Sequence, residues 1–518
     1  MTRRCGVLLH PTSLPGPHGS GDLGEHARHF VDWLVSARQS LWQVLPLGGV
    51  GDGNSPYMSD SAFAGNPALI DLQDLQHRGW LEAADLQPAT PFESGRVAYD
   101  VVTPWRLQRL ELASQRCFAA LRTDPQLAAQ FADFRRREQQ WLEDYALFKA
   151  LCEQYPGEAW HAWPRPLAAR EPRALSDARQ ALAARIAHWC FVQWCFDRQW
   201  QQLRGYAHSR GIRIVGDVPI FVSAHSVDVW VAPQLFQLDT AGGLEAVAGV
   251  PPDYFSPTGQ RWGNPLYRWE EHQRRGYDWW IERLRRTLAM VDEVRIDHFR
   301  GFAAYWRVPA EAIDATRGEW VAAPGEALFA ALRAALGPLP VIAEDLGTIT
   351  PDVTALRRSL GFPGMTVLQF AWDGDSANPY LPHNHARDSV VYTGTHDNDT
   401  SHGWWRGLDA RARRQFRDYF ELQPMPAPWQ ADGGADLDED TAARALMRAA
   451  CASVADTAVL PMQDILGPRV GRRMNTPGMA SGCWEWRFDW TDVGPEPAAQ
   501  LAEWCRRYGR GPVADAAR

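Results

Sequence analysis

The chain contains 518 residues, and its 53 basic and 62 acidic side chains give a formal net charge of -9. This balance argues against a nucleic-acid-binding surface and is ordinary for a soluble enzyme. No segment reaches the roughly 20 apolar residues of a membrane span, and the apolar run near Met1 is too short for a signal peptide, so we expect a cytoplasmic protein without a membrane partner.

Eight short apolar runs, each bounded by turn residues, have the length of strands. In chain order they are 5–11, 41–47, 212–220, 293–299, 339–345, 364–370, 389–397 and 457–464. Helical patterns precede several of them, at 30–37, 186–203 and 280–288. Apolar runs without alternation, separated by helices, are typical of parallel strands buried on both faces. The sequence therefore predicts an α/β fold, a (β/α)8 TIM barrel with inserted subdomains.

Uneven spacing of the runs predicts two insertions in the barrel. A helical pattern at 128–155 indicates a mainly helical subdomain between strands 2 and 3, over about residues 75–175. After strand 3, about residues 221–275 form an aromatic insertion, in which 250–269 has neither a helical nor a strand period. We expect a long functional loop there. The whole chain, 1–518, is predicted to be one catalytic domain that carries these insertions.

Six of the predicted strands end on side chains that can take part in chemistry. They are His10, Asp217, Asp297 with His298, Glu344 with Asp345, His396 with Asp397, and Asp464. Because the active site of such a barrel lies at the carboxyl ends of its strands, we expect these groups to converge on one mouth. Strand alternation places Arg295 and Asp297 on the same face. It places Glu344 and Asp345 on opposite faces, so only one of them can point into the mouth.

Three strand-end acids, Asp297, Glu344 and Asp397, suit glycosidic-bond chemistry, which pairs a carboxylate with a carboxylic acid. The 25 tryptophans could stack on sugar rings or build the core. The same acids with the strand-end histidines could instead bind a metal in a hydrolase barrel. Against a metal site, the first strand offers one histidine alone and the eight cysteines lack metal-ligand spacing. Asp397 could also act only as a helix cap.

Long motifs in register identify a family resemblance. They are LLHPTSLPGPHGSGDLG, GNSPYMSDSAFAGNPALIDL, GDVPIFV, VAGVPPDYFSPTGQRWGNPLY, VRIDHFRG, IAEDLG, VLQFAW, GTHDNDT and PMQDILG. On these motifs the chain resembles the 4-α-glucanotransferases, the amylomaltase or disproportionating enzyme family of the α-amylase superfamily. The resemblance implies transfer of α-1,4-glucan segments between maltooligosaccharides by a retaining double displacement. It implies glucan as the partner, with no cofactor and no metal.

The resemblance also implies roles for the three acids. Asp297 is expected to attack the anomeric carbon, Glu344 to protonate the leaving oxygen, and Asp397 to stabilise the distorted sugar and its positive charge. Arg295 would hold the nucleophile ionised. In a retaining enzyme the nucleophile and acid carboxyls lie about 5–5.5 Å apart.

Further residues are expected to contact substrate on the strength of the resemblance. They are His298, His396, Ser55, Tyr57, Asp253, Tyr254, Phe255 and Trp262, together with Asp217, Trp372, Asp373 and Asp464. An aromatic loop closing over the acceptor side would favour a glucan hydroxyl over water. The strand-end aspartates could instead cap the helices that follow them.

Departures from the family pattern and two other functions stay open. Asp52, His225, Met479 and Cys483 stand where the family commonly has other residues. An α-amylase-like hydrolase would use the same acids with water as the acceptor. A noncatalytic glucan-binding protein would have lost an acid, yet all three are present.

Overall fold

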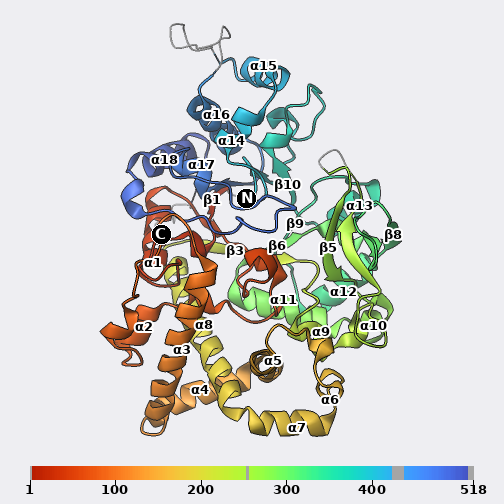
Figure 1. The fold of residues 1–518 in the computed structure, drawn as a ribbon. Helices are drawn as coiled ribbons and strands as arrows, with labels where there is room; N and C mark the ends of the chain where they lie inside the picture. Colours follow the sequence, from red (N-terminus) through yellow and green to blue (C-terminus); the bar gives the residue numbers. More distant parts are fainter. Residues whose placement is uncertain (1–2, 253–255, 423–436, 512–518) are drawn as a thin grey trace.

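A barrel of eight parallel strands forms the centre of the fold (Figure 1). The computed structural model describes residues 3–252, 256–422 and 437–511. The strand order is β10-β11-β12-β1-β2-β3-β6-β9, and the paired strands run parallel. The two outermost strands meet where the Ala343 amide donates to the Pro363 carbonyl at 2.9 Å. The predicted (β/α)8 barrel is therefore confirmed.

Each predicted apolar run contains one barrel strand. The bounds are β1 (Arg4–Leu8), β2 (Leu41–Gln43), β3 (Arg213–Pro219), β6 (Glu293–Asp297), β9 (Val341–Ala343), β10 (Gly364–Val367), β11 (Ser389–Tyr392) and β12 (Thr457–Pro461). Every residue of β10, β11 and β12 is buried. Both faces of these strands are covered, which explains why the runs lack polar alternation.

Helices surround the barrel. They include α1 (Glu25–Ser36), α8 (Ala183–Ser209), α11 (Asp278–Met290), α12 (Gly325–Leu336), α13 (Pro351–Ser359), α14 (Ser401–Gly407), α15 (Ala410–Tyr419), α16 (Glu439–Ala452), α17 (Met462–Leu466) and α18 (Glu496–Arg507). In α1 the side chains of Phe30, Trp33 and Leu34 are buried, as an amphipathic helix against a core requires. Among the described residues, no helix combines the length and apolarity needed to cross a membrane.

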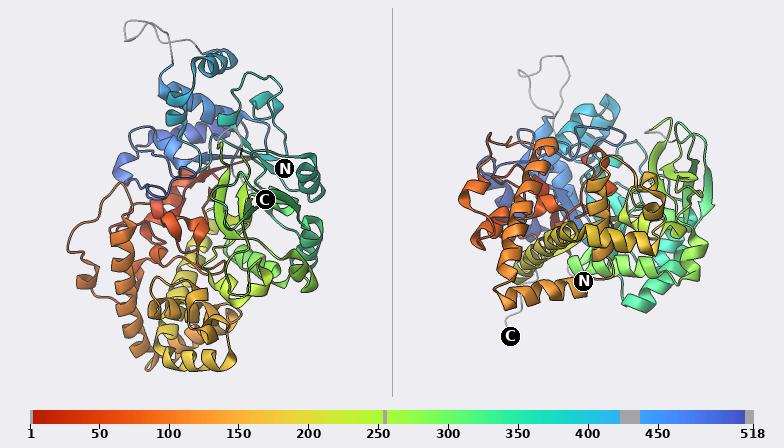
Figure 2. Two further views of the ribbon diagram at one scale, coloured as in Figure 1. Left: turned by 45° about the vertical axis from the view of Figure 1, so that its right-hand side comes forward. Right: turned by 60° about the horizontal axis from the view of Figure 1, so that its bottom comes forward.

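Between β2 and β3 the chain forms a group of helices at one end of the molecule (Figures 1 and 2). They are α2 (Leu72–His77), α3 (Tyr99–Leu121), α4 (Pro125–Arg137), α5 (Leu142–Gln154), α6 (Arg165–Ala168) and α7 (Pro172–Ala181), before α8 returns to the barrel. Asp124 sets the turn into α4, since its carboxylate accepts from the amides of Gln126 and Leu127 at 3.0 Å. We call this group the insertion helices.

After β3 the structure differs from the expected long loop. The chain forms a four-stranded antiparallel sheet in the order β5-β4-β7-β8, with β4 (Ala246–Val250), β5 (Gln260–Pro265), β7 (Ala304–Pro309) and β8 (Glu319–Ala322). Two short helices, α9 (Val227–Val231) and α10 (Trp269–Arg274), flank the first two strands in the chain. The expectation that 250–269 lacks strands is wrong because β5 lies within it. Gly263, at φ 82°, and a bulge in β4 interrupt the local alternation, while pairing with the distant β7 stabilises β4.

One buried arginine joins the insertion helices to the barrel. Arg106 on α3 is 1% exposed and donates to the carbonyls of His18, at 3.1 Å, and Ile70. Its guanidinium also lies 3.6 Å from the buried carboxyl of Asp22. These three partners lie in the segments that follow β1 and β2, so the arginine ties the base of the insertion to the barrel.

Replacing this arginine should destabilise the whole chain. Arg106→Met leaves a buried carboxyl and two carbonyls without their donor, and we expect a loss of about 3–5 kcal/mol in the free energy of unfolding. Urea denaturation measures it. The control Arg136→Met removes a surface arginine that pairs with the exposed Asp133 and should change stability by less than about 0.5 kcal/mol. Equal effects of the two substitutions would contradict the anchoring role.

Candidate active site

The barrel mouth is organised around Arg295, which is 3% exposed. This residue lies opposite Asp217 in the register of β6 against β3. Its Nη1 donates to both oxygens of Asp217, at 2.9 and 2.7 Å, and its Nη2 donates to Asp297 Oδ1 at 2.7 Å. Burial opposes the charged form, but the two carboxylates outweigh it and raise the pKa of Arg295 above its ordinary value. A permanent positive charge therefore stands beside Asp297.

Glu344 follows β9 and faces the same mouth. Its Oε2 accepts from the His298 amide at 2.7 Å and its Oε1 from the Leu346 amide at 3.0 Å. Burial, and then the negative charge of Asp297, raise the pKa of Glu344 to about 8. Asp345 turns the other way, accepting from the Met365 amide at 2.8 Å. Glu344 is thus the member of this pair at the mouth, and it is protonated in neutral solution.

Asp397 follows β11 and stands apart from the first ion pair. Its Oδ1 accepts from Asn475 Nδ2 at 2.6 Å, and its Oδ2 lies 3.4 Å from His396 Nε2. Arg473 donates to the Asp397 carbonyl at 2.5 Å. The side chain of Asp397 is 42% exposed. The carboxylate is consequently held in one orientation while it remains open to a ligand.

Two neutral histidines line the mouth near the acids. Burial lowers the pKa of His298 to about 4 and that of His10 to about 3. His298 adopts a left-handed backbone conformation, φ 52°, which aims its amide at Glu344. Its Nε2 and both ring nitrogens of His10 are buried without a hydrogen-bond partner among the described residues. These nitrogens can bond a polar ligand such as a sugar hydroxyl.

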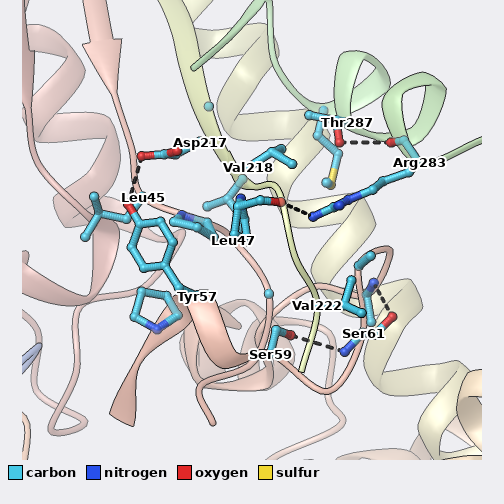
Figure 3. Close-up of a pocket in the computed structure, with 18 of the residues that line it drawn as sticks. Leu45, Leu47, Tyr57, Ser59, Ser61, Asp217, Val218, Val222, Arg283 and Thr287 are labelled. Atoms are coloured by element: carbon cyan, nitrogen blue, oxygen red, sulfur yellow. Dashed lines mark hydrogen bonds between the residues drawn. The ribbon is translucent and has the colours of Figure 1, made fainter. Parts of the chain in front are cut away.

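Aromatic rings from separate segments complete the mouth. Tyr57 stands in a 3-10 turn that begins at Ser55, whose hydroxyl accepts from the Tyr57 amide at 3.2 Å. The Tyr57 hydroxyl donates to Asp217 at 2.9 Å (Figure 3). Its ring stacks on His396 at 5.2 Å, and Trp484 lies 5.6 Å from it. Trp262 packs edge-on against His298 at 4.8 Å.

Some predicted site residues have other partners. Asp464 is buried and accepts from Thr393 and Ser401, so it stabilises the chain after β11. Trp372 packs against Phe416 at 4.7 Å, on α15. Asp373 is exposed and accepts from the Asp375 amide at 2.9 Å. Asp217 is fully engaged by Arg295 and Tyr57. The predicted contacts Asp253, Tyr254 and Phe255 lie outside the described residues.

Three residues at the mouth were missing from the predicted site: Asn475, Arg473 and Trp484. They come from the segment 472–486, whose departures at Met479 and Cys483 had obscured its match to the family. Asn475, in the MNTPG stretch, could have indicated this contact, because an amide side chain can orient a carboxylate.

The residues that depart from the family pattern have separate surroundings. His225 accepts from the Trp160 amide at 3.1 Å, and Met479 and Asp52 are exposed.

Metal ligands were an open alternative for this mouth. Within the described ranges, no group of three or more His, Cys, Asp or Glu side chains is arranged to hold a metal ion. All eight cysteines are free thiols. The arrangement therefore offers carboxylates, a guanidinium and neutral imidazoles as its chemical groups.

Comparison with known proteins gives consistent matches. A family model described as 4-alpha-glucanotransferase matches residues 9–492. The 4-alpha-glucanotransferase of Thermus thermophilus is 49% identical over 97% of this chain and 98% of its own length. That of Synechocystis sp. is 46% identical over 98% of this chain and 99% of its own. A solved structure titled amylomaltase from Streptococcus agalactiae in complex with acarbose superposes with a TM-score of 0.91, at 37% identity, covering 98% of this chain and all of that one.

The unusual acidity of Glu344 can be tested directly. Carbon-13 NMR of glutamate carboxyls, assigned with Glu344→Gln, should show this group titrating near pH 8. Asp297→Asn removes the neighbouring negative charge, so the pKa should fall, while burial keeps it above the ordinary 4.5. Asp345→Asn is the control, because that carboxyl points away and should leave the titration unchanged. A pKa near 4.5 in the unaltered protein would contradict the assignment.

Proposed function

The chain belongs to the 4-alpha-glucanotransferase family, and from this premise we propose that it transfers α-1,4-glucan segments between maltooligosaccharides by a retaining double displacement. One observation carries the mechanism: Arg295 binds Asp297 at 2.7 Å beside the partly buried Glu344, whose pKa is about 8. A guanidinium is bonded to the first acid and the second acid carries a proton, an arrangement that suits cleavage of a glycosidic bond.

In the first step Asp297 is the nucleophile. Arg295 occupies Oδ1, and no partner for Oδ2 is found among the described residues, so Oδ2 attacks the anomeric carbon of the donor sugar. As the bond from that carbon to the glycosidic oxygen breaks, Glu344 gives its proton to the oxygen. The leaving chain departs with a free 4-hydroxyl, and a covalent glycosyl ester remains on Asp297.

In the second step a glucan hydroxyl replaces the leaving chain. Glu344, now a carboxylate, takes the proton from the 4-hydroxyl of an acceptor as that oxygen attacks the anomeric carbon and releases Asp297. Two inversions give net retention. Esterification removes the negative charge of Asp297, so the pKa of Glu344 falls in the intermediate and the group can act as a carboxylate base.

The remaining groups stabilise the positively charged sugar between these steps. Asp397, oriented by Asn475 at 2.6 Å, bonds hydroxyls of the distorted ring. His298 and His396 bond further hydroxyls, and Tyr57 supplies the platform on which the donor sugar stacks. Ser55 holds the turn that presents this ring.

Transfer requires that the acceptor exclude water from the glycosyl ester. We assign this role to Trp262, which packs on His298 beside the nucleophile, together with Asp253, Tyr254 and Phe255 of the same segment.

We also propose that residues 1–518 act as one catalytic domain. The eight cysteines are free thiols, which is consistent with a cytoplasmic location.

Incubation with maltotriose alone distinguishes transfer from hydrolysis. We expect glucose and longer oligosaccharides at a constant number of reducing ends, because each transfer breaks one glycosidic bond and makes another. Glu344→Gln should lower the rate by about 10²–10⁴-fold, since it removes the general acid. Rising reducing ends with shorter products only would make the enzyme a hydrolase and refute the acceptor role of Trp262.

The pH dependence follows from the same acid. Glu344 must be protonated to cleave the donor, so kcat/KM for maltotriose should fall about tenfold per pH unit above about pH 8. With α-maltosyl fluoride as donor, fluoride leaves without a proton, and the fall in the glycosylation rate above pH 8 should disappear. Stopped-flow measurement of fluoride release provides the test. An identical alkaline limb for both donors would assign the titrating group elsewhere.

A further inference from the structure

A second cavity lies between the insertion helices and the barrel. Its volume is about 700 Å³, and it is walled by the junction of α4 with α5, by α8, by α9 and by α11. Its lining does not include Asp297, Glu344 or Asp397. The size is within the range of small-molecule sites. The cavity is therefore a separate feature from the barrel mouth.

Aromatic rings form part of its wall. Trp141, at the α4–α5 junction, lies nearly parallel to Phe63 at a centroid distance of 6.4 Å and an interplanar angle of 20°. Trp279 on α11 meets Phe63 edge-on at 6.3 Å. Both indoles are only partly buried. Broad aromatic faces of this kind stack on the apolar faces of sugar rings.

The arginines around these rings are paired with carboxylates. Arg286 binds Asp197 at 3.1 Å, Arg275 binds Asp278 at 2.7 Å, and Glu138 receives a hydrogen bond from Arg137. The lining carries four arginines and six carboxylates. Each arginine is paired with a carboxylate, and two of the acids have partners outside the lining, since Asp144 binds Arg170 and Asp228 accepts from the Ala62 amide. The lining therefore does not suit an anion. It presents hydrogen-bond donors and acceptors around aromatic faces, and the matching ligand is a neutral polyol.

We propose that this cavity is an accessory site for a short α-1,4-glucan segment. The inference rests on the proposed function, because the enzyme's substrate is then the neutral polyhydroxylated ligand to which it is exposed. Trp141 and Trp279 supply the aromatic surface, and each has an arginine over its ring at 5.2 Å, Arg286 and Arg283 respectively. The hydroxyls are bonded by Glu138 and Asp197 and by the exposed amide side chains at the rim, Gln140 and Gln201.

The cavity adjoins the loop that carries the donor platform. Ser59, Ser61 and Ala62 line the pocket beneath Tyr57 (Figure 3), and Ser61 and Phe63 line the accessory cavity on the other side. The Ala62 amide also donates to Asp228, a cavity residue, at 2.8 Å. A glucan bound in the cavity thus lies against the loop that positions Tyr57.

Isothermal titration with maltotriose tests the proposal in a chain that cannot turn it over. Glu344→Gln should bind maltotriose at two sites, one in the barrel mouth and one in the cavity. Adding Ala289→Trp fills the cavity from α11, where Ala289 is exposed, and should reduce the stoichiometry to one. Trp141→Ala in the same background should also bind at one site, through loss of the stacking face.

Ala330→Trp on α12 is the matched control, since it adds the same ring at an exposed helical alanine away from the cavity. It should retain two sites. A single site in Glu344→Gln alone, or two sites that survive Ala289→Trp, would overturn the accessory site while the proposed function stands. Binding at neither site would instead overturn the proposed function itself, and the accessory site with it.

Discussion

The barrel mouth depends on the ion pairs that Arg295 forms with Asp217 and Asp297. A guanidinium buried this deeply is costly unless carboxylates surround it, and here two of them do. Asp217 is entirely buried and holds both the arginine and the Tyr57 hydroxyl. Asp297 is partly exposed. The pairing of β3 with β6 thereby orients the Asp297 carboxylate through Arg295.

The same geometry gives Asp297 and Glu344 different surroundings. Arg295 donates directly to Asp297 but reaches Glu344 only as a more distant charge, while the burial of Glu344 opposes its ionisation. The backbone links the two acids, because the amide of His298, the residue after Asp297, donates to Glu344. His298 makes that contact from a left-handed backbone conformation, at φ 52°.

The barrel could be predicted from sequence because each strand lies in one short apolar run, and five of these runs also carry an acid at their end. Arg295 with Asp297, and Glu344 opposite Asp345, follow from strand alternation alone. The antiparallel sheet and the Asn475 contact could not be predicted, because they depend on segments far apart in the sequence. The strand β4 is paired on one side by β5 and on the other by β7, some 60 residues away, and Asn475 reaches Asp397 from a segment with no strand or helix period. Asp464 looked like a site acid, yet its environment engages both of its oxygens.

A second ion pair, between Lys149 and Asp60, joins the insertion helices to the loop at the barrel mouth. Lys149 is the single lysine of a chain whose other basic residues are arginines, and from α5 it binds Asp60 on the loop that carries Tyr57. Its ammonium also lies 5.0 Å from the Trp189 ring centre. The compact ammonium of lysine fits between a carboxylate and an indole, whereas the planar guanidinium of arginine is larger and needs more room. Tyr57 is therefore held at two points. Arg295 positions its hydroxyl through Asp217, and Lys149 positions its loop through Asp60. That makes the insertion helices part of the active-site architecture.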